Sequence, residues 1–145
     1  MQAAADGGFW MLRLDEGERL PEALVAWARA EGIRAAAVVS GIGLVRDTEL
    51  GYLRNGRYEP ATFREPMELL ALGGSIADVD GAPSVHLHLT GGRADHTAVG
   101  GHLLRSTVAL LAEIGVRTFP RHRFSRPEIP GTTLRRLELA PVPRP

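Results

Sequence analysis

Apolar and polar side chains alternate strictly in the stretch Ser84-Val85-His86-Leu87-His88-Leu89-Thr90. This period of two predicts a β-strand whose apolar face packs against a core. The two His fall on the opposite face, with Cα atoms roughly 6.6 Å apart at the usual rise per residue. Two ring nitrogens can converge on one cation from that separation, so the stretch predicts a half-buried strand and a His pair suited to chelation.

Strand-like patterns continue on both sides of this stretch and are separated by short turns. Asn55-Gly56 and Asp80-Gly81 are pairs that favour tight hairpin turns, and Gly73-Gly74 indicates a bulge within a strand. The segment 107–114 also fits a short buried helix, although we favour a strand. The other expected strands cover residues 9–14, 33–39, 48–53, 58–63, 67–76, 98–104 and 134–139, with glycine-rich bends at 40–43 and 91–92.

One helix is expected near the N-terminus. Its apolar face consists of Leu20, Ala23, Leu24, Trp27 and Ala28, and Gly32 marks its end. One helix among many strands predicts an α+β fold, a single domain with a largely antiparallel twisted sheet and one main N-terminal helix. The expected parts of the chain are a flexible N-terminus at 1–8, the domain at 9–139 and a Pro-rich tail at 140–145.

The residue types that the chain lacks exclude several kinds of chemistry. The 145 residues include no Cys, which removes disulfides, thiolate catalysis and every Cys-based zinc site. All 17 basic residues are Arg, so Schiff-base chemistry and a P-loop lysine are excluded as well. No apolar run reaches the ~18 residues of a membrane span, and residues 1–12 lack the features of a signal peptide. We therefore expect a cytoplasmic protein that binds no membrane.

A third His completes a candidate metal site. His102 follows a Gly-Gly pair in Val99-Gly100-Gly101-His102-Leu103, and the glycines would let the backbone pass close to a neighbouring strand. Three neutral imidazoles with a fourth position open are typical of catalytic zinc, so the expected cofactor is a divalent metal, zinc. The alternative is that the three His only occupy polar surface, as we expect for His96 and His122.

Two carboxylates lie within apolar runs of the sequence. Glu68 is flanked by Met67 and Leu69, and Glu113 precedes Ile114. A partly buried carboxylate can act as a general acid or base, but it is more often the partner of an Arg. Glu68 and Glu113 are therefore candidate catalytic residues with a simple structural alternative.

The last part of the chain is basic. Residues 117–145 carry seven Arg and two acidic residues, although the formal net charge of the chain is zero. Arg121, Arg123 and Arg126 alternate with aromatic residues and could bind nucleic acid or another anion. A solvated, Pro-interrupted loop is the alternative reading of this segment.

These motifs, in this order, resemble the plant and prokaryote conserved (PPC) domain, also called DUF296. The resemblance runs from about Phe9 to Leu139 and includes Ser40-Gly41-Ile42-Gly43 and the stretch from Glu65 to Gly74. Its most specific part is His86-Leu87-His88 followed by Gly100-Gly101-His102-Leu103. The resemblance implies an α+β fold, a homotrimer, a metal held by the three His as in prokaryotic members, and the DNA-binding or regulatory role that is the family's usual label.

A more remote resemblance is to acetolactate decarboxylase, which has a similar architecture and a three-His zinc site with a His-x-His pair. This resemblance implies the alternative function, a zinc-dependent lyase or hydrolase that acts on a small molecule bound at the metal. By analogy of fold, Glu68, Glu113 and Arg123 would then handle protons and a carboxylate.

Overall fold

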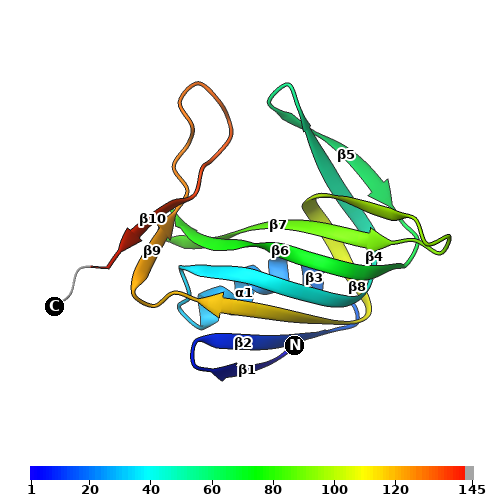
Figure 1. Cartoon of the computed structure of the whole chain (residues 1–145), viewed down its shortest axis with the longest axis horizontal. Helices are drawn as coiled ribbons and strands as arrows, with labels where there is room; N and C mark the ends of the chain where they lie inside the picture. Colours follow the sequence, from blue (N-terminus) through cyan, green and yellow to red (C-terminus); the bar gives the residue numbers. More distant parts are fainter. Residues whose placement is uncertain (143–145) are drawn as a thin grey trace.

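Long, strongly bent strands form most of this protein, and one short helix packs against them (Figure 1). The computed structural model describes residues 1–142. The elements are β1 (Gln2–Asp6), β2 (Phe9–Asp15), β3 (Arg19–Leu20), α1 (Glu22–Ala30), β4 (Ala36–Arg54), β5 (Arg57–Phe63), β6 (Met67–Val79), β7 (Ala82–Gly92), β8 (Ala98–Thr118), β9 (His122–Ser125) and β10 (Glu138–Pro141). This arrangement confirms the predicted α+β fold with a single main helix.

Four strands close into a ring around the core. β4 pairs with β6 and β8, and β7 also pairs with β6 and β8. These pairings are antiparallel, and within residues 1–142 the one parallel pairing joins Asp78 of β6 to Ser125 of β9. The largely antiparallel sheet is therefore confirmed. The buried apolar side chains include Val45, Leu50, Leu69, Leu72, Ile76, Leu87, Leu89, Leu103 and Ile114.

The helix α1 buries the face that its sequence predicts. Leu24, Trp27 and Ala28 are buried, and the Trp27 ring meets the edge of the Trp10 ring with centroids 5.2 Å apart. In the part of the chain described here, no helix is long and apolar enough to cross a membrane.

Two of the long strands were each expected as two shorter ones. The bend predicted at 40–43 is wrong, because β4 runs continuously through it from Ala36 to Arg54. Register shifts against β8 absorb the extra residues. Gly43 has φ 141°, and an added Cβ would lie 2.2 Å from the carbonyl oxygen of Leu111. The glycine therefore permits a close crossing of strands where we expected a turn. Likewise, the segments at 98–104 and 107–114 form one strand, β8.

The structure also differs from the sequence prediction at the ends of the chain, at one predicted bend and at one predicted bulge. Residues 2–6 form β1, which pairs with β2 at the edge of the sheet, although we expected the domain to start at residue 9. The bend predicted at 91–92 lies inside β7, and the chain turns after it. The bulge predicted at 73–74 lies instead between Leu69 and Ala71. The last strand begins at Glu138, and the final three residues of the predicted tail lie outside the described residues.

Candidate metal centre

The pairing of β7 with β8 brings three His side chains together. His88 of β7 lies directly opposite His102 of β8, and His86 is two residues before His88 on the same face of the strand. The ring centroids are 5.2 Å apart for His86 and His88, 4.7 Å for His86 and His102, and 5.5 Å for His88 and His102. One nitrogen from each ring lies within 4.8 Å of the other two. The structure therefore assembles the predicted cluster.

Two glycines set the positions of these strands. Gly101 precedes His102, and an added Cβ there would lie 2.9 Å from the carbonyl oxygen of Gly51 in β4. The expected close approach beside the Gly-Gly pair is therefore present. Gly74 of β6 faces β7, and its Cβ would lie 1.9 Å from the carbonyl oxygen of His86. At both positions the strands lie so close together that a side chain would collide with a backbone carbonyl oxygen, and only glycine avoids this.

Burial keeps two of the three imidazoles neutral. Burial is the largest of the causes that together lower the pKa of His86 to about 4, and the charge of Arg126 and the neighbouring His102 and His88 act in the same direction. The pKa of His102 is also lowered, mainly by burial. A neutral imidazole has a free lone pair, and a metal ligand must be in this form. The buried Nδ1 of His102 has no hydrogen-bond partner within the described part of the chain. The donor set and its protonation therefore fit a divalent metal with nitrogen ligands.

An aromatic ring that the sequence analysis did not single out packs on the cluster. Tyr58 of β5 stacks on His102, with centroids 4.3 Å apart and an interplanar angle of 15°. The signal for this contact was present in the Asn55-Gly56 turn. The hairpin that this turn forms places Tyr58 of β5 opposite Leu53 of β4. Leu53 lies two residues after Gly51, and Gly51 pairs with His102 of β8, so Tyr58 is brought close to His102.

The three candidate anion-binding arginines do not lie in one patch. Arg121 and Arg123 are exposed at the start of β9, whereas Arg126 is only 9% exposed. Its Nη2 donates a hydrogen bond of 2.5 Å to the Oγ of Ser75, and Ser75 lies opposite His86 in the β6–β7 register. Arg126 therefore belongs to the surroundings of the His cluster, which the sequence analysis did not foresee.

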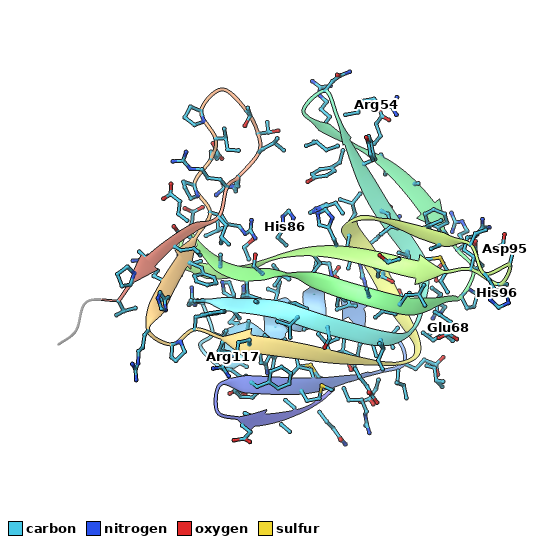
Figure 2. All side chains as sticks on the ribbon, in the orientation of Figure 1. Arg54, Glu68, His86, Asp95, His96 and Arg117 are labelled. Carbon is cyan, nitrogen blue, oxygen red and sulfur yellow. The ribbon has the colours of Figure 1, made fainter. Side chains whose placement is uncertain are left out.

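The two candidate catalytic carboxylates lie elsewhere on the protomer. Glu68 is exposed near the start of β6, and Figure 2 shows it well away from His86. Glu113 is half-buried on β8. In the strand register it lies opposite Arg13 of β2 on one side and Ile42 of β4 on the other. Within residues 1–142, the cluster of metal-ligating side chains contains only His.

Comparison with known proteins assigns the chain to a family. The family model of the Plants and Prokaryotes Conserved (PCC) domain, which is the PPC domain of the resemblance above, matches residues 1–120. The chain belongs to this family. This PCC-domain chain has the same fold as several solved structures. A protein from Ralstonia eutropha JMP134, described as a candidate DNA-binding protein, is 31% identical, with a TM-score of 0.87 over 95% of this chain and 96% of that one.

Two further solved structures are similar. A Bacteroides thetaiotaomicron protein, also described as a candidate DNA-binding protein, has a TM-score of 0.88, 28% identity and coverage of 94% and 96% of the two chains. A protein from Archaeoglobus fulgidus described as metal-containing has a TM-score of 0.82, 30% identity and coverage of 91% and 94%. The curated relatives are longer. The chain is 35% identical to the bifunctional protein GlmU of a Synechococcus strain over 90% of its own length, but spans only 20% of that protein.

Proposed function

We propose that the protein is a metal-binding PCC-domain protein in which His86, His88 and His102 hold one zinc ion. The observation that carries the proposal is the convergence of three ring nitrogens within 4.8 Å of one another. Two hydrogen-bonded strands carry all three rings, so little chain entropy is lost when a metal binds. The 30% identical Archaeoglobus relative, described as metal-containing, supports the same assignment.

Zinc suits the donors that this chain offers. Imidazole nitrogens bind zinc at about 2.0–2.1 Å, and three such ligands leave one position of a tetrahedral site for water or a ligand oxygen. In that position the metal would act as a Lewis acid on the bound oxygen.

A chelator competition tests the site. The wild-type protein should bind zinc in competition with a chromophoric chelator at about one ion per chain. His88→Ala should bind it at least about 10- to 100-fold more weakly, because even residues that only support a metal ligand cost this much when they are removed. His96→Ala is the matched control, since His96 lies in the β7–β8 turn, outside the cluster. Equal zinc binding by His88→Ala and His96→Ala would refute the proposal.

We also propose that the protein assembles as a homotrimer through the outer face of β2, β4 and β8. Phe9 and Met11 of β2 are 39% and 46% exposed, and Ile42 of β4 is 57% exposed. The strand registers place Met11 and Ile42 on the same face of the sheet. An exposed apolar face of this kind is typical of subunit contacts.

DNA binding is the second candidate function. Both the Ralstonia and the Bacteroides relatives are described as candidate DNA-binding proteins. Arg121 and Arg123 are exposed, and in the described part of the chain neither forms a salt bridge. Fluorescence anisotropy with a labelled duplex tests this function, because phosphate contacts make the affinity fall steeply with salt. The alternative, a zinc-dependent small-molecule enzyme, has less support, because neither of the predicted catalytic carboxylates, Glu68 and Glu113, belongs to the His cluster.

A further inference from the structure

A buried arginine without a countercharge adjoins the His cluster. Arg126 is nine-tenths buried, and none of the salt bridges formed within residues 1–142 involves it. Its Nε is buried and has no hydrogen-bond partner there. A guanidinium taken out of water without a partner is costly, so an anion that binds beside it would gain a strong interaction.

One hydrogen bond positions this guanidinium, and a second holds the backbone that carries it. Nη2 donates to Ser75 Oγ at 2.5 Å, and Ser75 lies directly across from His86 in the paired strands. The backbone carbonyl of Arg126 accepts a 3.0 Å hydrogen bond from Nη1 of Arg135, which holds the segment after β9 in place. The charge of Arg126 therefore acts at the imidazoles, and it contributes to the lowered pKa values of His86 and His102.

The surroundings leave room for a small molecule. Figure 1 shows two segments that project from the same side of the sheet, the β4–β5 hairpin and the loop between β9 and β10. A cavity of about 340 Å³ adjoins Arg126 itself and is also lined by Arg123, Arg135, Asp78 and Glu138. Figure 2 shows His86 on the side of β7 from which these segments project. This volume is in the range of small-molecule sites.

We propose that Arg126 binds an oxyanion, the carboxylate or phosphate of a small molecule, whose oxygen also occupies the open position of the His-bound metal. The guanidinium has N–H groups in a planar fork that matches either oxyanion, and only one is used by Ser75. A metal held by three neutral imidazoles keeps its full positive charge, so the metal and the guanidinium together favour an anionic ligand. This inference rests on the metal site of the proposed function.

The test loads the full-length protein with Co²⁺, whose visible spectrum changes when the fourth ligand changes, and titrates it with acetate and, separately, with inorganic phosphate. Metal content is measured first for every variant, so that failure of the metal site and failure of the anion site are distinguished. The anion that binds the Co²⁺ protein with the higher affinity identifies the class of ligand, a carboxylate or a phosphate. Arg126→Gln should bind Co²⁺ as the wild type does and bind the preferred anion about 10- to 100-fold more weakly, as expected for loss of a charge-assisted hydrogen bond.

Three further variants separate ligand binding from a structural role. Arg126→Lys should recover part of the anion affinity, because the charge is restored without the fork. Ser75→Ala removes only the hydrogen bond that orients the guanidinium and should weaken the anion several-fold, which keeps the test valid if Arg126→Gln does not fold. Arg29→Gln, at an exposed position on α1 away from the cluster, should match the wild type.

Three results would overturn the inference. The first is that neither anion alters the spectrum of the Co²⁺ protein at millimolar concentration. The second is equal anion affinity in wild type and Arg126→Gln, which would mean that the metal alone holds the anion. The third is loss of Co²⁺ binding in both Arg126→Gln and Ser75→Ala, which would make the arginine a support of the His cluster. A wild-type protein that binds no metal would overturn the proposed function, and this inference with it.

Discussion

Substitution of Gly74 by Ala tests whether strand packing sets the geometry of the His cluster. A Cβ at position 74 would lie 1.9 Å from the carbonyl oxygen of His86, and real Cβ atoms essentially never approach closer than 3.0 Å. β6 and β7 must therefore separate by about 1.1 Å at His86, or the backbone must bend there. Metal–ligand distances tolerate only about 0.2 Å. We expect Gly74→Ala to lose roughly 1–3 kcal/mol of stability, as overpacked sites do, and about 10- to 100-fold in metal affinity, as displaced ligands do.

Gly73→Ala is the matched control for this substitution. It adds the same methyl group to the same strand, but its Cβ meets only the carbonyl oxygen of Val38, at 3.9 Å. Urea unfolding of the metal-free proteins gives the stability difference, and zinc competition with a chelator gives the affinity. The reasoning is refuted if Gly74→Ala and Gly73→Ala have the same unfolding midpoint and the same zinc affinity.

Three further predictions concern acid stability, assembly and DNA. The folded pKa of His86, about 4, is below its ordinary value of 6.5, so only the unfolded chain takes up this proton between those pH values. The metal-free protein should therefore lose roughly 1–3 kcal/mol as pH falls through this window; an equal loss in His86→Gln by urea unfolding would contradict this. Ile42→Asp should convert a trimer to monomers in light scattering after size exclusion, whereas an unchanged mass would rule out this face. If DNA binds, replacing Arg121 and Arg123 with Gln should lower the salt slope of the affinity by about 2; an unchanged slope in anisotropy titrations would exclude these contacts.

Local patterns were sufficient to predict the strands and the helix, but not how far the strands continue. The alternation in 84–90 and the Asn55-Gly56 turn each describe interactions between residues close in sequence, and the structure contains the strand and the hairpin that they predict. The glycines at 40–43 were interpreted as a bend because glycine usually interrupts a strand. In the structure Gly43 permits β8 to cross closely, and that contact joins residues almost 70 positions apart. Such a requirement is not visible in a local window.

The candidate site also combines features that local sequence patterns predict with features that only the tertiary fold creates. The His-x-His pair follows from strand periodicity, and the Gly-Gly pair before His102 indicated the close approach that the structure contains. The position of Arg126 depends on the contact of the segment after β9 with Ser75 of β6, which only the tertiary fold brings together. The sequence analysis placed Arg126 in one basic patch with Arg121 and Arg123, because it considered only their spacing along the chain. In the structure Arg126 is buried, whereas the other two are exposed.

The most direct test of the metal assignment is a crystal structure of the protein grown with zinc, with diffraction data collected on both sides of the zinc absorption edge. The account predicts one strong anomalous peak per chain, about 2.0–2.1 Å from one nitrogen each of His86, His88 and His102. A peak coordinated by fewer than these three His, or zinc found only elsewhere on the surface, would contradict it.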